Sequence, residues 1–322
     1  MESQNKICAI GIYYGKFKNY FELWLKTCSY NPNIDFIIVT DIKYEKNLPS
    51  NVIFKEFTLE EVRNLAIRVT GLNVCLPRPY KTCDLRPLYG EMFKDILTNY
   101  EYWGEFDFDM LYGDIWKFMK EYDYQNFDKF LPLGHLSFYR NTADVNNLYT
   151  LEGGKRGNYK EILTNPGVFA FDEVDGINSI MLYHNRPLFY KRIFADITPL
   201  HSRLTLSELP STGGERSKNY KHQVFYWSKG RVYRAYLFND KIEEEEFAYI
   251  HLRERPDFEI DEKILESEEF YITKTGFIPK VGGVTKDILM DNNKRESIII
   301  EKMEVLYDRY KAYKKAIVKK LR

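Results

Sequence analysis

The chain has 322 residues, of which 44% are hydrophobic and 16% aromatic, so it can fold around a sizeable core. Its 47 basic and 47 acidic residues balance, which argues against a nucleic-acid-binding protein because such proteins usually carry a basic excess. The four cysteines form no CxxC pair, and no apolar run approaches the roughly 18 residues of a membrane span. Neither a zinc site nor a transmembrane helix is therefore expected.

Strands and helices alternate through the first third of the chain. The N-terminus lacks the charged start and apolar stretch of a signal peptide, and sparse cysteines suit a reducing compartment, so we expect a cytoplasmic protein. Apolar spacing, turn residues and a Thr58/Glu61 capping box indicate the elements. Strands are predicted at residues 6–14, 34–41, 51–54 and 100–109, and helices between them at residues 21–28, 62–71 and 77–97. This alternation predicts an α/β fold with a Rossmann-type, mostly parallel mixed sheet and flanking helices.

The remaining two thirds of the chain are more mixed. Residues 129–141 and 167–181 each have the pattern of a strand, a polar turn and a helix, and further strands are predicted at residues 187–197, 222–227, 231–238 and 243–257. A final helix is predicted from about residue 295 to the end. We therefore expect a catalytic domain over residues 1–255 and an extension over residues 256–322.

Three acidic residues alternate with apolar ones in the strand predicted at residues 100–109. Glu105, Asp107 and Asp109 would lie on one strand face, where like charges repel, and no basic residue interrupts them. They could be a solvated strand edge. Alternatively, Asp107 and Asp109 could hold a divalent cation such as Mg²⁺ or Mn²⁺, because hard cations prefer carboxylate oxygen and open α/β sheets bind ligands at the carboxyl ends of their strands.

A histidine near the end of a late strand is a candidate third ligand. His251 follows an apolar run and precedes Arg253 and Arg255. A lone histidine is most often an ordinary surface or core residue. Metal, imidazole and guanidinium groups together could instead hold a diphosphate, since the guanidinium fork binds phosphate with two hydrogen bonds.

Five motifs in this order resemble a bacterial group of glycosyltransferase-like proteins encoded in capsule and surface-polysaccharide gene clusters. The resemblance extends from about Lys6 to Arg255. The motifs are "GIYYGKFKNYFELWLKTCSYNPNIDFIIVTD", "PYKTCDLRPLYGEMF", "YWGEFDFDMLYGDI", "GHLSFYRN" and "EFAYIHLRER". The ordered set is far more specific than any single motif.

This resemblance implies a GT-A-like fold, a nucleotide-sugar donor and Mn²⁺ or Mg²⁺. Asp107 and Asp109 would match the family's Asp-x-Asp metal motif, and His251 would match the late histidine ligand of some retaining members. Glu105 departs from the family pattern, where a small or neutral residue is expected, so it is interpreted as a neighbour of the metal site and not as a ligand.

The resemblance also implies roles for residues in other loops. Asp41 could equally be a turn residue, and Lys81 and Arg86 could lie on a solvated helix face. The residues expected at the donor are Tyr13, Gly15, Asp41, Lys81, Asp84, Arg86, His135, Arg140, Asn141 and Arg253. The candidate catalytic carboxylates are Asp172, Glu173 and Asp175, for which helix capping is the alternative.

The last fifteen residues differ from the rest of the chain. Seven basic residues and no acid follow Asp308, and four apolar or aromatic side chains can share one helical face. A basic amphipathic helix is typical of a membrane surface, although a helix packed on the domain would show the same pattern. A lipid-linked acceptor, which the resemblance implies, would favour peripheral membrane contact.

Together these observations predict a metal-dependent glycosyltransferase. It would move a hexose, with galactose or glucose favoured, from a UDP-sugar to a growing, lipid-linked capsule or surface glycan, with retention of configuration favoured. Two alternatives remain open. A phosphoesterase or nucleotidyltransferase could use the same acids, and a non-catalytic sugar-binding protein could retain them without turnover.

Overall fold

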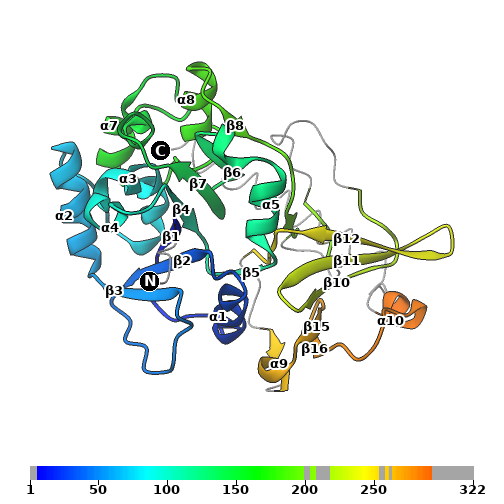
Figure 1. The fold of residues 1–322 in the computed structure, drawn as a ribbon. Coiled ribbons are helices and arrows are strands. Elements are labelled where there is room, and N and C mark those ends of the chain that lie inside the picture. The colour runs from blue at the N-terminus through cyan, green and yellow to red at the C-terminus, as the bar shows by residue number, and fades with distance from the viewer. Residues whose placement is uncertain (1–5, 199–203, 208–217, 254–257, 261–262, 292–322) are drawn as a thin grey trace, which may run out of the picture. The chain divides into compact units, whose positions relative to one another are not determined.

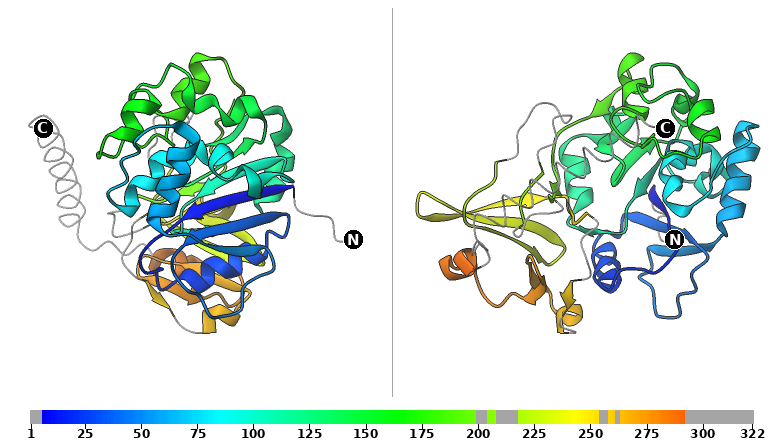
Figure 2. Two further views of the ribbon diagram at one scale, coloured as in Figure 1. Left: turned by 90° about the vertical axis from the view of Figure 1, so that its left-hand side faces the viewer. Right: turned by 180° about the vertical axis from the view of Figure 1, so that it is seen from behind.

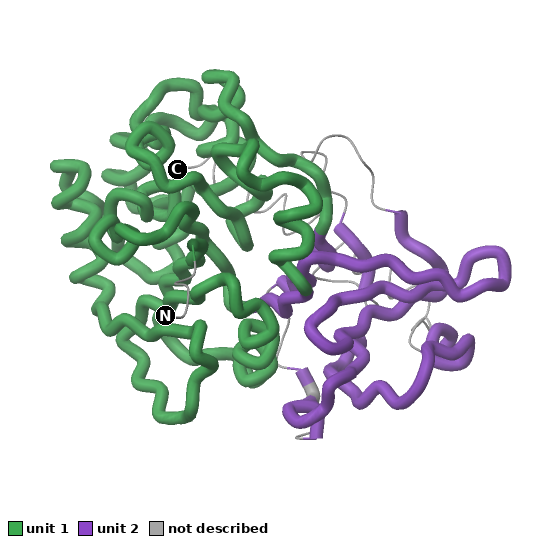
Figure 3. Tube along the Cα trace, in the orientation of Figure 1, with its two compact units in different colours: residues 1–108, 114–193, 210–215 green, residues 109–113, 194–209, 216–322 purple. Residues whose placement is uncertain are grey.

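The computed structural model describes residues 6–198, 204–207, 218–253, 258–260 and 263–291. The described chain forms two compact units (Figure 3). The first contains residues 6–108 and 114–193, and the second contains residues 109–113 and the described residues from 194 onward. This division does not coincide with the predicted boundary at residue 255. No helix among the described residues is long and apolar enough to cross a membrane.

The first unit is built on a seven-stranded mixed sheet in the order β3-β2-β1-β4-β7-β6-β8 (Figure 1). Strands β1 to β4 are parallel, β7 is antiparallel to both β4 and β6, and β8 is parallel to β6. The strands are β1 Ile7–Ile12, β2 Ile34–Thr40, β3 Val52–Glu56, β4 Tyr102–Phe106, β6 Lys129–Leu133, β7 Leu136–Arg140 and β8 Leu188–Phe189. The predicted α/β class with a Rossmann-type mixed sheet is confirmed.

Helices cover both faces of this sheet because its central strands are apolar on both faces (Figure 2). On one face, Trp24 of the first helix packs against Phe36 and Phe106. On the other, Ile37 and Val39 join a core cluster with residues of η1, α2, α3, α7 and α8. The helices are α1 Phe21–Ser29, α2 Leu59–Thr70, η1 Pro79–Leu88, α3 Tyr89–Met92, α4 Lys94–Leu97, α5 Ile115–Glu121, η2 Tyr124–Asn126, α6 Ala143–Asn146, η3 Leu148–Thr150, α7 Tyr159–Thr164 and α8 Ile177–Tyr183.

Local signals account for several of these boundaries. The predicted capping box is present at the start of α2, and Gly71 ends that helix in the left-handed conformation. The single helix predicted over residues 77–97 is wrong: this segment is a 3-10 helix with Pro87 inside it, followed by two short helices. Proline has no N–H for the α-helical ladder, which is consistent with this interruption.

The predicted pattern of residues 129–141 and 167–181 is also only partly correct. Residues 129–140 form the hairpin of β6 and β7, where a strand followed by a helix was predicted. Residues 167–176 contain no strand, although α8 follows them as predicted. Both stretches contain buried polar side chains, such as Ser137 and Asp172. The spacing of the apolar residues around them does not indicate that these polar side chains are buried.

The second unit contains a six-stranded and a three-stranded sheet, in the orders β12-β11-β10-β15-β16-β14 and β5-β13-β9. Its elements are β5 Met110–Tyr112, β9 Ala195–Asp196, β10 Gln223–Ser228, β11 Arg231–Phe238, β12 Lys241–Phe247, β13 Tyr249–His251, β14 Glu259–Ile260, α9 Lys263–Glu266, β15 Glu269–Ile272, β16 Gly276–Pro279 and α10 Lys286–Asp291. Strands β10 and β15 pair directly, which explains why residues on both sides of the predicted boundary at 255 share one unit. The predicted C-terminal amphipathic helix lies outside the described residues.

Candidate active site

A partly buried arginine joins two acidic residues in the first unit, beyond the carboxyl end of β4. Arg86, on η1, forms ion pairs with Asp107 and with Asp172, the latter at 2.8 Å. It also donates a hydrogen bond to the Gly134 carbonyl oxygen at 2.7 Å. Strand β4 ends at Phe106, so Asp107 follows the end of this central strand as predicted, and its N–H donates to the His135 carbonyl oxygen at 2.9 Å.

Gly134, in the turn between β6 and β7, allows Asp172 to approach the backbone. A Cβ atom at this position would overlap with the Asp172 carboxylate and would lie 3.1 Å from an Arg86 nitrogen. Both neighbours are held in an ion pair, so they have little freedom to move away. The glycine is therefore required by close approach.

Replacing Gly134 by alanine should destabilise the protein by about 1–3 kcal/mol, the usual cost of overpacking a tight site. Urea unfolding of the variant and the wild type measures this difference. Gly283→Ala is the matched control, because a Cβ at Gly283 would meet nothing within 4 Å. Equal losses in the two variants, or none in Gly134→Ala, would contradict the close approach.

Asp172 combines burial with an open hydrogen-bonding position. Its side chain is 4% exposed, and within the described residues its Oδ1 atom has no hydrogen-bond partner. Burial raises the pKa of Asp172 to about 6, although the charge of Arg86 opposes the shift. Burial and the charge of Asp172 raise the pKa of its neighbour Glu173 to about 7. Two carboxyl groups with raised pKa values side by side are typical of functional sites.

Asp175, the third predicted catalytic carboxylate, lies apart from this pair. Its side chain is 46% exposed and lies 3.9 Å from Lys155 and 3.6 Å from Arg156. The cap of α8 is Gly176, and no side chain caps that helix. The structure thus favours Asp172 and Glu173 over Asp175, and the capping alternative is wrong for all three.

Glu105 is buried within the sheet of the first unit. Its Oε1 accepts hydrogen bonds from Ser137 Oγ at 2.6 Å and from Tyr139 Oη at 3.2 Å. Burial raises the pKa of Glu105 to about 8, against the opposing charge of Lys129. Lys129 is itself buried and donates to Asn178 Oδ1 at 2.8 Å. Glu105 therefore belongs to a polar core network.

In the second unit, strand pairing brings His251 to Asp109. Strand β13 is antiparallel to β5, with His251 opposite Met110, and the Leu252 N–H donates to the Asp109 carbonyl oxygen at 2.8 Å. The His251 Nε2 atom lies 3.3 Å from Asp109 Oδ1. These two predicted ligands, 142 positions apart in the sequence (251 minus 109), therefore face one another.

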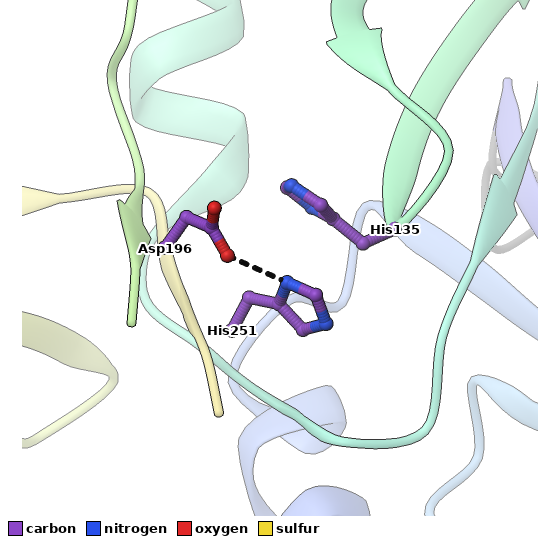
Figure 4. A group of neighbouring side chains, drawn as sticks. All are labelled: His135, Asp196 and His251. Atoms are coloured by element: carbon purple, nitrogen blue, oxygen red, sulfur yellow. Dashed lines mark hydrogen bonds and ion pairs between the residues drawn. The ribbon is translucent and has the colours of Figure 1, made fainter. Parts of the chain in front are cut away.

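The other imidazole nitrogen faces a carboxylate that the sequence did not reveal. His251 Nδ1 lies 2.9 Å from Asp196 Oδ1, and a dashed line marks this contact in Figure 4. Burial alone would lower the pKa of His251, but the carboxylates of Asp109 and Asp196 outweigh it and raise that pKa to about 10. Arg253 also binds Asp196 and does so through two nitrogens, one of them at 2.7 Å. A single aspartate in the predicted strand 187–197 was the only available signal, and it matched no motif.

Each of the three alternating acids thus has its own cationic neighbour. Arg86 pairs with Asp107, His251 lies against Asp109, and the charge of Lys129 acts on Glu105. The positive charge absent from the acidic stretch comes from three distant segments of the chain. The solvated strand edge is therefore wrong for Glu105, which is fully buried.

Lys81 and Asp84, both predicted at the donor, form a buried structural pair. Lys81 Nζ lies 2.9 Å from Asp84 Oδ2 and donates to the carbonyl oxygens of Ile162 and Gly167. Asp84 accepts hydrogen bonds from the N–H groups of residues 169 and 171. With side chains 2% and 0% exposed, the pair holds the segment that leads to Asp172 and does not present a surface for a donor.

Arg140 and Asn141 are also placed away from the predicted donor site. Strands β4 and β7 are antiparallel, so Arg140 lies opposite Tyr102, at the end of β4 remote from Asp107. Arg140 pairs with Asp128 at 3.5 Å, and the Asn141 amide donates to the carbonyl oxygens of Leu97, at the end of α4, and Tyr100, before β4. Their expected contact with a donor stays a prediction, and these contacts do not favour it.

The remaining residues predicted at the donor lie in loops at strand ends, as the sequence pattern predicts. Tyr13 and Gly15 follow β1, and the Tyr13 ring stacks on Phe17 with centroids 5.0 Å apart. Gly15 has a φ of 117° and open space around it. Asp41 directly follows β2 and is exposed, and His135 is buried in the turn between β6 and β7. All four positions are in loops at strand ends, where α/β sheets bind ligands.

Among these groups, a carboxylate and an imidazole are the ones suited to a cation. Asp109 and His251 offer an oxygen and a nitrogen ligand in the second unit, and Asp107 precedes Asp109 by two residues in the chain. Two carboxylates and an imidazole suit Mn²⁺ or Mg²⁺. Asp172 and Glu173 offer carboxylates for hydroxyl groups or for proton transfer.

Comparison with protein families finds one match. A family model described as "Family of unknown function (DUF6625)" matches residues 9–281. No curated protein matches the chain. The matched range includes every candidate residue described above.

Proposed function

The chain belongs to the DUF6625 family, whose function is unknown, and we propose that it is a metal-dependent glycosyltransferase with a GT-A-like fold. It would move a hexose, galactose or glucose, from a UDP-sugar to a lipid-linked capsule or surface glycan. The observation that carries the proposal is the position of His251 Nε2 at 3.3 Å from Asp109 Oδ1. A late histidine beside the Asp-x-Asp motif is the arrangement that the sequence resemblance predicts.

The donor set fits Mn²⁺ or Mg²⁺. Asp107, Asp109 and His251 would hold the ion, and the Asp196 carboxylate on the far side of the imidazole supports a ligand role for Nε2. The cation would neutralise the charge that develops on the leaving nucleoside diphosphate. Arg86 holds the Asp107 carboxylate in place, because its guanidinium pairs with that side chain.

The sugar would be recognised in the first unit by the groups around Asp172. The Oδ1 atom of Asp172 is a buried acceptor with no partner among the described residues, and a sugar hydroxyl can donate to it. The raised pKa of Glu173, about 7, suits a group that exchanges a proton near neutral pH. Tyr13 and Asp41, in loops after β1 and β2, are the proposed contacts for the nucleotide.

Thermal unfolding with UDP and Mn²⁺ tests the proposal. We expect UDP to raise the melting temperature only when Mn²⁺ is present, because a ligand that binds the folded state at about 100 times its Kd adds about 2.7 kcal/mol. His251→Ala should remove most of this shift. His184→Ala is the matched control, since His184 is exposed and bonded only to a loop carbonyl oxygen.

Product analysis separates the glycosyltransferase from the two alternatives. UDP-galactose and UDP-glucose are incubated with Mn²⁺ and a lipid-linked acceptor, and the products are identified by mass spectrometry. Sugar transfer with release of UDP supports the proposal. Cleavage of a phosphate ester or transfer of a nucleotide would contradict it in favour of a phosphoesterase or nucleotidyltransferase, and sugar binding without turnover would indicate a non-catalytic protein.

A further inference from the structure

We propose that Asp196 is a positioning residue that fixes the imidazole of His251 for metal binding; this inference rests on the metal site of the proposed function. Asp196 ends β9, which is parallel to β13, and the register places it directly opposite His251. Its side chain is fully buried, and its carboxylate points toward the His251 ring in Figure 4. A buried carboxylate in this position needs partners that balance its charge and donate hydrogen bonds to its oxygens.

His251, Arg253 and Ser207 hold the Asp196 carboxylate through hydrogen bonds. Oδ1 lies 2.9 Å from His251 Nδ1 and accepts from Arg253 Nε at 2.7 Å. Oδ2 accepts from Ser207 Oγ at 2.5 Å and from a second nitrogen of Arg253. The Ser207 N–H also donates to the Asp196 carbonyl oxygen at 2.7 Å, so the residue is held through both its side chain and its backbone.

This arrangement determines which imidazole nitrogen can bind a cation. An ionised carboxylate only accepts hydrogen bonds, so Nδ1 must carry a proton to bond with Asp196. A cation that displaces the second ring proton would then bind at Nε2, which is the nitrogen beside Asp109. Carboxylates behind metal-bound histidines orient the ring in this way in many proteins.

Arg253 pairs with the Asp196 carboxylate. Its guanidinium meets the carboxylate with two nitrogens, and its backbone adopts a left-handed conformation, with φ 49°. Non-glycine residues adopt this conformation at a cost that surrounding contacts must offset. The cation predicted to contact a donor diphosphate thus also balances the charge behind His251.

The first test measures Mn²⁺ affinity by calorimetry on the full chain. Asp196→Asn keeps the size of the side chain, but its amide can donate to Nδ1 and move the ring proton to Nε2. We expect Mn²⁺ affinity to fall roughly 10- to 100-fold. Asp240→Asn, on an exposed turn, is the matched control and should bind as tightly as the wild type. Unchanged affinity in Asp196→Asn would overturn the inference.

A double-mutant cycle separates positioning from a general structural effect. If Asp196 acts through the imidazole, Asp196→Asn should not weaken Mn²⁺ binding further in a His251→Ala background. A structural role would instead lower the affinity by the same factor in both backgrounds, and that result would overturn the inference.

A second measurement needs no variant, which matters if Asp196→Asn does not fold. In wild-type protein with ¹⁵N-labelled histidine and diamagnetic Zn²⁺, NMR should show the proton of His251 on Nδ1 and the metal on Nε2. A proton on Nε2 would overturn the role of Asp196 and leave the proposed activity standing. Failure of the wild type to bind any of these ions would overturn the metal site itself, and the inference with it.

Discussion

Asp109→Asn is expected to abolish Mn²⁺-dependent sugar transfer while the fold remains intact. Asparagine preserves the shape of the side chain but removes the charge that a divalent cation requires. Metal ions contribute several kcal/mol of charge stabilisation, and each 1.4 kcal/mol is about tenfold in rate, so we expect a loss of at least about 10³-fold. Initial rates at limiting Mn²⁺ and circular dichroism of the same samples measure the two parts of this prediction.

Asp107→Asn should lose activity to a similar extent. Asp107 is paired with Arg86 and Asp109 with His251, so neutralising either carboxylate should also lower the melting temperature. Asp95→Asn, an exposed aspartate on α4, controls for loss of a negative charge. Near-wild-type turnover in both variants would rule out the metal site.

Local sequence patterns predicted the first half of the fold well. The apolar runs of β1 and β2 and the capping box of α2 depend on neighbours a few residues away, so they are visible in a single chain. The hairpin of β6 and β7 was not predicted because β7 contains Ser137 and Tyr139, whose hydroxyl groups bind buried Glu105. Glu105 is more than 30 residues away in the sequence, so this contact is not visible in a local pattern. Polar groups inside a sheet disguise a strand when only hydrophobic periodicity is considered.

The sequence indicated the candidate ligands but not the residues that contact them. Asp107 and Asp109 follow a strand, and His251 ends one, which are recognisable positions. Asp196 gave no comparable signal, because its importance arises from the parallel pairing of β9, only two residues long, with β13. The position of Arg140 was unpredictable for the same reason. Strand β7 is antiparallel to β4, so Arg140 lies at the end of the sheet opposite to Asp107, and the composition of β7 does not indicate its direction.

Arg86→Met is expected to be the most destabilising single change in the first unit. Methionine fills a similar volume but leaves Asp107 and Asp172 without their shared cation. Removal of one partner of a buried ion pair typically costs about 3–5 kcal/mol. The loss should come mainly from Asp172, whose side chain is 4% exposed, because Asp107, at 33%, can be hydrated. Arg86→Lys should be intermediate, since an ammonium group cannot span both carboxylates. Arg68→Met, on the exposed face of α2, is the control.

The deficit of Arg86→Met should depend on pH in a predictable direction. Burial already raises the pKa of Asp172 to about 6, above the ordinary value of 3.8, so the folded state binds the proton more tightly and stability falls as pH rises between these values. Arg86 opposes this shift, and its removal should raise the folded pKa further. Protonation then relieves the variant at pH 5, while at pH 8 the carboxylate is ionised, buried and unpaired. Urea unfolding at both pH values should therefore show a larger deficit at pH 8. An equal deficit at the two values would mean that Arg86 stabilises the fold by packing and not by its charge.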